Sequence, residues 1–147
     1  MGKTDYKIKS IRIDSENICY GPMPKPNDEV FQHLTVNSKG RVWLTRYTFG
    51  NGFSDYSLKS KEYYRLSDEA TKLLFDALED YFFDDNSEIY EVTDVGSWSA
   101  MIILENEEPI AWHGSLISDE GKLHNISEMI RSELKSNLIY AFDGGMI

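Results

Sequence analysis

The clearest pattern in the chain is a helical spacing of apolar residues after Ser67. Successive apolar side chains stand three or four positions apart, as on one face of an α-helix. Ser67 can cap such a helix, and Asp68 and Glu69 follow in the first turn, where the helix dipole favours anions. The pattern predicts an amphipathic helix that begins at Ser67 and ends at Asp84-Asp85-Asn86. Its stripe consists of Ala70, Leu73, Leu74, Ala77, Leu78, Tyr81 and Phe82.

A second helical stripe lies near the C-terminus. Asn125 can cap a helix, and Glu128 stands three residues later, at the capping-box position. We therefore predict a helix that begins near Asn125, followed by a short strand from Leu138 to Phe142. The buried stripe of this helix would be Ile126, Met129, Ile130 and Leu134.

The first half of the chain is rich in β-branched and aromatic residues, which favour strands. Val30 to Val36 and Arg41 to Phe49 read as a hairpin, because Gly40 can take the positive φ that closes the loop between them. A loop is predicted around the three prolines of residues 21–28, since proline removes backbone donors. Further strands are predicted at Tyr6 to Ile13 and Glu62 to Leu66.

The second half contains further candidate strands. Glu88 to Thr93 is one, and Trp98 to Leu104 and Ile110 to Leu116 form a second predicted hairpin around residues 105–109. Met101 and Ile103 make the second face of their strand partly apolar, which is typical of a central strand covered on both sides.

Hairpins dominate this order of elements, and strands do not alternate regularly with helices. The sequence therefore predicts an α+β fold, with an antiparallel sheet built from hairpins and two helices packed on one face, and not a doubly wound parallel sheet. A chain of 147 residues suits a single domain spanning residues 1–147. Residues 1–5 and 144–147 are expected to be flexible ends.

The charge is unevenly distributed along the chain. Residues 1–66 contain 11 Lys/Arg and 7 Asp/Glu, a balance of +4, whereas residues 67–147 contain 4 Lys/Arg and 18 Asp/Glu, a balance of −14. The net charge of −10 argues against direct nucleic-acid binding, which requires a cationic surface. The polar N-terminus, the single Cys19 and the lack of a long apolar run predict a cytoplasmic protein without a membrane span.

The candidate polar site is Trp112-His113-Gly114-Ser115-Leu116. On a strand, His113 and Ser115 would share a face but stand roughly 7 Å apart, which is too far for direct proton transfer. A strand with outward polar residues and a buried Trp112 explains the same pattern, so no catalytic residue is assigned. A hydrolase that pairs His113 with a distant carboxylate such as Asp94 stays an alternative, because catalytic triads assemble from distant positions.

Two segments are candidates for interaction. Phe49, Phe53 and Tyr56 flank the glycines of residues 50–52, and an exposed loop with these aromatic residues could anchor a partner. Asp80, Asp84 and Asp85 belong to an acidic stretch that could imitate a phosphate backbone and block a nucleic-acid-binding protein. The competing interpretations are an ordinary turn, and the solvated face and end of a helix.

Motifs for metals and cofactors are not found. The three histidines and the many carboxylates lack the spacing of zinc or calcium sites, and residues 50–52 contain only an isolated G-x-G. We therefore predict neither a metal nor a cofactor.

Three segments resemble a family of small bacterial proteins that has no assigned activity. They are Arg41-Val42-Trp43-Leu44-Thr45-Arg46-Tyr47-Thr48-Phe49-Gly50, the Trp112 to Leu116 segment, and Phe142-Asp143-Gly144. The resemblance covers most of residues 30–144. It implies a bacterial single-domain protein and no particular catalytic residue.

The leading functional prediction is a non-enzymatic protein-interaction domain, of an accessory, immunity-like or phage-related kind. Its basis is the small size, the charge asymmetry, the abundant tyrosine and tryptophan, and the lack of a coherent catalytic set. The hydrolase and the acidic nucleic-acid mimic are the alternatives, and the expected partner is another protein.

Overall fold

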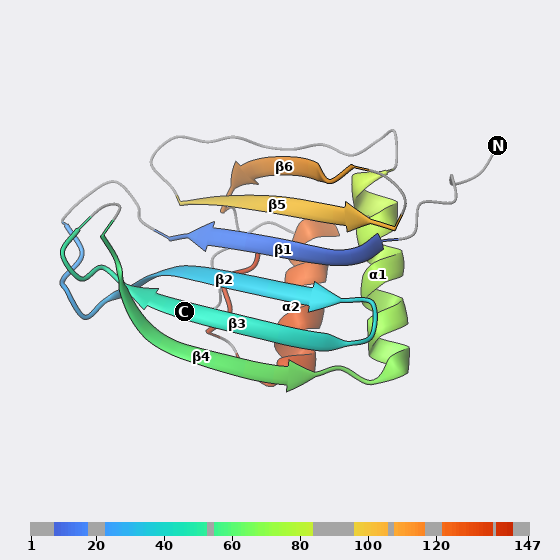
Figure 1. The fold of residues 1–147 in the computed structure, drawn as a ribbon, viewed down its shortest axis with the longest axis horizontal. Helices are drawn as coiled ribbons and strands as arrows, with labels where there is room; N and C mark the ends of the chain where they lie inside the picture. Colours follow the sequence, from blue (N-terminus) through green and yellow to red (C-terminus); the bar gives the residue numbers. More distant parts are fainter. Residues whose placement is uncertain are drawn as a thin grey trace.

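The computed structural model describes residues 8–17, 23–52, 55–83, 96–105, 108–116, 122–136 and 138–142. Its strands form one six-stranded sheet in the order β4-β3-β2-β1-β5-β6, and each neighbouring pair is antiparallel. Two helices complete the described elements, so the predicted α+β class with an antiparallel sheet and two helices is confirmed (Figure 1). The strands are β1 (Ile8–Glu16), β2 (Glu29–Asn37), β3 (Arg41–Thr48), β4 (Ser57–Arg65), β5 (Ser97–Leu104) and β6 (Ile110–Ser115).

The predicted β2–β3 hairpin is confirmed, and Gly40 closes its turn. Gly40 has φ +84°, donates its amide to the Asn37 carbonyl at 3.0 Å, and accepts a hydrogen bond from the Leu66 amide. A Cβ at position 40 would stand 2.8 Å from the Leu66 carbonyl oxygen. Glycine is therefore required both by the backbone conformation and by the chain that crosses beside it.

One face of the sheet carries the core. Alternate residues of the strands are buried, including Ile11, Leu34, Leu44 and Ile102, because successive side chains of a strand point to opposite faces. Both helices contribute side chains to this core, and Figure 1 shows both behind the sheet. Packing is close here, since the cavity between β2, β3 and the helices holds only about 10 Å³.

Helix α1 (Asp68–Phe82) has the predicted N-cap, because Ser67 Oγ accepts a hydrogen bond from the Ala70 amide at 3.1 Å. The predicted burial of Leu73 is wrong, since this side chain is 55% exposed. Thr71 is buried instead, where its hydroxyl donates to the Ser67 carbonyl. The other predicted residues of the stripe are buried or half-buried, as expected.

Helix α2 (Lys122–Leu134) begins earlier than predicted, so Asn125 is an exposed residue within the helix and not its cap. Leu123 packs against the core and continues the apolar stripe toward the N-terminus, which explains the earlier start. Glu128 accordingly pairs with Arg131 Nη1 at 3.0 Å and does not form a capping box. Neither described helix has the length and apolar character that a membrane crossing requires.

The predicted last strand is wrong, because residues 138–142 are irregular. Side chains take the place of a partner strand: each carbonyl from Leu138 to Ala141 accepts a hydrogen bond from Ser15, Gln32, Arg46 or Arg131. Buried backbone groups must be paired, and here polar side chains pair them. The predicted strand at residues 88–93 lies outside the described residues.

The second predicted hairpin corresponds to β5 and β6, but β5 is not covered on both sides as predicted. Met101 is 41% exposed on the face opposite the core. None of the described elements lies over this second face, which we call the open face (Figure 1).

Candidate functional site

The open face over β3 and β4 carries aromatic and cationic side chains in facing pairs. Arg41 lies opposite Arg65, Trp43 opposite Tyr63, and Thr45 opposite Lys61. The intervening residues Val42 and Leu44 point into the core, so these six side chains share the open face. We call this set the β3–β4 array: Arg41, Trp43, Thr45, Lys61, Tyr63 and Arg65.

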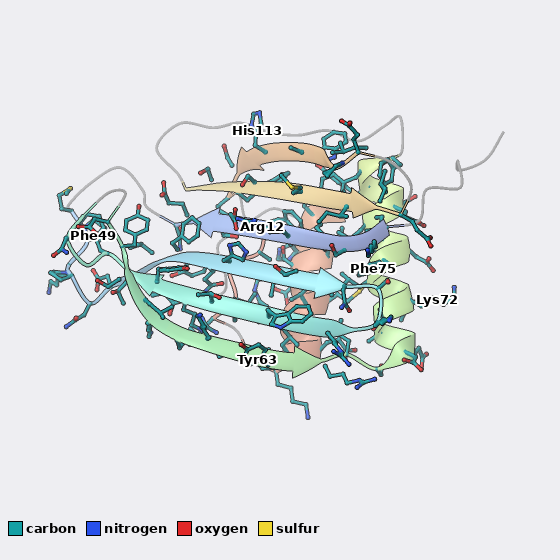
Figure 2. All side chains as sticks on the ribbon, in the orientation of Figure 1. Arg12, Phe49, Tyr63, Lys72, Phe75 and His113 are labelled. Carbon is teal, nitrogen blue, oxygen red and sulfur yellow. The ribbon has the colours of Figure 1, made fainter. Side chains whose placement is uncertain are left out.

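The β3–β4 array is well exposed. Tyr63 has 69% of its surface accessible, and Arg41, Lys61 and Arg65 are also exposed. Figure 2 shows Tyr63 on β4, at the edge of the sheet. The exposed ring offers apolar area to a partner, and tyrosine is enriched at protein interfaces.

All charged side chains of the β3–β4 array are cationic. Arg41, Lys61 and Arg65 form no ion pair with any of the described residues, and the array contains no carboxylate. Thr45 of β3 is paired with His33 of β2, which is paired with Asp14 of β1. The nearest acidic residue along this line of paired residues is therefore two strands from Thr45. The chain as a whole carries −10, so this patch opposes the overall charge.

The centre of the open face holds a His–Asp pair. His33 Nδ1 lies 2.9 Å from Asp14 Oδ1, and Arg12 Nη2 lies 3.6 Å from Asp14 Oδ2. Asp14 Oδ1 is buried beside His33. Burial alone raises the pKa of Asp14, but His33 and Arg12 outweigh it and hold that pKa below its ordinary value. Neither side chain lines the groove described below.

Two aromatic residues of the predicted interaction loop, Phe49 and Tyr56, pack against neighbouring aromatic rings. Phe49 is only 6% exposed, and its ring lies 6.1 Å from that of Tyr56, which contacts Phe31 at 6.0 Å. The Tyr56 hydroxyl donates to Glu16 Oε2 at 2.9 Å, and burial together with that carboxylate raises the pKa of Tyr56. Figure 2 shows Phe49 at the end of the sheet away from Lys72 and Phe75. Phe53 lies outside the described residues.

The other predicted site residues are separated in space. His113 is exposed on the edge strand β6, opposite Ser99, whereas Ser115 is buried. Figure 2 places His113 at the outer edge of the sheet. Asp80 lies in the last turns of α1, on another layer of the molecule. Asp84, Asp85 and Asp94 lie outside the described residues, so the acidic surface and the His113–Asp94 pairing stay predictions.

A polar cluster on the core side fixes the C-terminal segment. Arg46, whose side chain is 7% exposed, donates to Glu62 Oε2 at 2.7 Å, to Glu29 Oε2 at 2.8 Å and to the Leu138 carbonyl at 2.9 Å. Burial alone raises the pKa of Glu29 and of Glu62, but hydrogen bonds that include those from Arg46 outweigh it and lower both values. Gln32 bonds Leu138 and Tyr140 of the same segment. The cluster is satisfied internally, so we assign it a structural role.

A groove of about 650 Å³ lies between α1, the start of β1 and the β2–β3 turn. Its lining includes Phe75, three lysines, three acidic residues of α1, and Glu105. One of these lysines, Lys72, forms an ion pair with Asp76 at 3.2 Å. Charges of both signs surround the groove, so charge does not select one class of ligand. Within the described part of the chain, no three His, Cys, Asp or Glu residues are placed to hold a metal ion.

The sequence was compared with protein-family models and with curated proteins. No match was found in either set. The resemblance to small bacterial proteins therefore stays a prediction.

Sequence inspection missed the β3–β4 array because half of it lies on a polar strand. Ser57 to Lys61 shows no alternation of apolar and polar residues, so β4 was predicted only from Glu62. The usable signal was the clustering of Lys59, Lys61 and Arg65 with Tyr63, close in sequence to the hairpin that holds Trp43.

Proposed function

We propose that this protein is a non-enzymatic protein-interaction domain that docks its partner on the open face of β3 and β4. The observation that carries the proposal is the pairing of Trp43 with Tyr63, which is 69% exposed, on a sheet face over which no described element lies. Tryptophan, tyrosine and arginine are the residues that most often dominate binding energy at protein interfaces. The β3–β4 array combines all three.

The scaffold supports this role. Trp43 and Tyr63 stand on paired strands whose other faces pack into the core or contact Arg46, so their backbones are fixed before a partner arrives. A preorganised surface loses little conformational freedom on binding, which favours affinity. An accessory, immunity-like or phage-related factor in the cytoplasm is the kind of protein that fits such a domain.

An enzymatic role has less support from the same geometry. Catalysis generally uses concave sites that exclude water. The His33–Asp14 pair lies on the open face, and none of the histidines lines the groove beside α1. His113 is exposed on an edge strand.

Capture of a partner from a lysate of the source cell tests the proposal. We expect the wild-type protein to retain one stoichiometric partner, and the Trp43→Ala, Tyr63→Ala double variant to lose at least nine-tenths of it, since hot-spot residues each contribute about 2 kcal/mol or more. Leu73→Ala is the matched control, because Leu73 is 55% exposed but lies on α1. Equal capture by the double variant, or no captured partner, would contradict the docking role.

A further inference from the structure

We propose that the partner presents carboxylate side chains to the β3–β4 array, so that an acidic protein surface, and not a nucleic acid, occupies the open face. This inference rests on the proposed docking function and adds the chemistry of the partner. It follows from how the cations are arranged, from the size of the patch and from the charge of the rest of the chain.

The arrangement of the cations is unfavourable in the free protein. Arg41 and Arg65 are directly opposite one another on neighbouring strands, and like charges in that position repel. Neither forms an ion pair with the described residues. A carboxylate placed between the two guanidinium groups would remove the repulsion and accept hydrogen bonds from both, because the planar fork of arginine matches a carboxylate.

The aromatic pair adjoins this cationic pair. Trp43 and Tyr63 are the next facing residues on the open face, and Lys61 follows on β4. An incoming acidic residue would therefore meet two arginines, while its apolar neighbours would contact the two rings. This combination suits an amphipathic acidic segment better than an isolated small anion.

The size of the array favours a protein over a nucleic acid. From Arg41 to Thr45 it extends roughly 14 Å along two strands, which are about 5 Å apart. About two and a half turns of an acidic helix, roughly 14 Å long, would cover that length. Beyond β2 the open face carries Asp14 and Glu16, and its Arg12 is paired with Asp14. The chain carries −10 in all, so a long polyanion would be repelled outside the patch.

The inference predicts binding of a defined acidic probe, a short poly-L-glutamate peptide, by the full-length protein. We expect measurable affinity at low salt that weakens as salt is raised, and at least a tenfold loss in the Arg41→Glu variant. Arg41→Glu should not lower the melting temperature, because it places a glutamate opposite Arg65. Lys72→Glu is the control for the change in charge, because Lys72 is exposed on α1. The affinity of this variant for the probe should equal that of the wild type.

Several results would overturn the inference. They are absence of binding to poly-L-glutamate, equal affinity of Arg41→Glu and wild type, or tighter binding of a single-stranded DNA of equal charge, which would identify a nucleic-acid surface instead. A cellular partner whose capture depends on Trp43 and Tyr63 but not on Arg41 would also overturn it while leaving the docking function intact. If neither the wild-type protein nor any variant captures a partner, the result counts against the docking function itself.

Discussion

Replacing Arg131 with alanine should lower the free energy of unfolding by about 3–5 kcal/mol, because hydrogen bonds to a charged group contribute about 1.5–3 kcal/mol each. Arg131 is 2% exposed on α2, and its guanidinium donates to the Ile139 carbonyl at 2.8 Å and to the Tyr140 carbonyl at 3.3 Å. Alanine would leave the carbonyls of buried Ile139 and half-buried Tyr140 without these partners, and each unsatisfied group that is buried costs about 1–3 kcal/mol. Urea unfolding followed by tryptophan fluorescence measures the change.

Two further variants distinguish the loss of the Arg131 hydrogen bonds from the effect of introducing alanine into a helix. Ser132→Ala changes the adjacent exposed residue and should alter stability by less than about 0.5 kcal/mol, as is usual for surface substitutions. Arg131→Lys keeps the charge but not the planar fork, so we expect an intermediate loss. If Arg131→Ala were within about 1 kcal/mol of wild type, the segment 138–142 would not depend on this residue.

Replacing Arg46 with alanine should cost about 3 kcal/mol at neutral pH, the lower end of the range for breaking a buried ion pair, since Glu62 is 29% exposed. Without Arg46, the carboxylates of Glu29 and Glu62 lose a shared cation, and the Leu138 carbonyl loses one donor. Unfolding curves of variant and wild type at pH 7 measure this difference. Lys61→Ala on the opposite face is the control and should have little effect.

The Arg46 effect should depend on pH in a defined direction. Glu29 and Glu62 have pKa values lowered from 4.5 in the folded protein, so their ionised forms stabilise the fold above pH 4.5. That contribution is lost as the pH falls through the lowered pKa values. Wild-type stability should therefore decline on acidification, and the gap between wild type and Arg46→Ala should narrow below pH 4. A gap that stays constant between pH 7 and pH 3 would show that the ion pairs contribute nothing.

Local signals explain why parts of the fold could be predicted from sequence. The N-cap Ser67, the apolar stripe of α1 apart from Leu73, and the Gly40 turn each act within a few residues, and they occur in the structure as expected. Errors arose where a neighbour elsewhere in the chain decides the conformation. Leu138 to Phe142 has strand-forming residues, but side chains of β1, β2, β3 and α2 bind its backbone and hold it irregular.

The candidate site depends on strand register, which composition does not reveal. Arg41 and Arg65 are 24 positions apart in the sequence and face one another only because β3 and β4 pair at that register. The same holds for Asp14 and His33, which meet across β1 and β2. By contrast, Phe49 and Tyr56 of the predicted aromatic loop pack against one another, and Tyr56 also contacts Phe31, so Phe49 is buried where the prediction requires an exposed side chain. Exposure of single side chains is a tertiary property.

Photo-crosslinking from position 63 tests most directly the claim that the partner docks on β3 and β4. A photoreactive phenylalanine analogue would replace Tyr63 in one variant and Leu73, exposed on α1, in another. The proposed docking predicts that the captured partner crosslinks to position 63 and not to position 73, and that Arg41→Glu abolishes the crosslink. A partner that crosslinks only to position 73 would contradict the account and place the interaction surface on the helical layer.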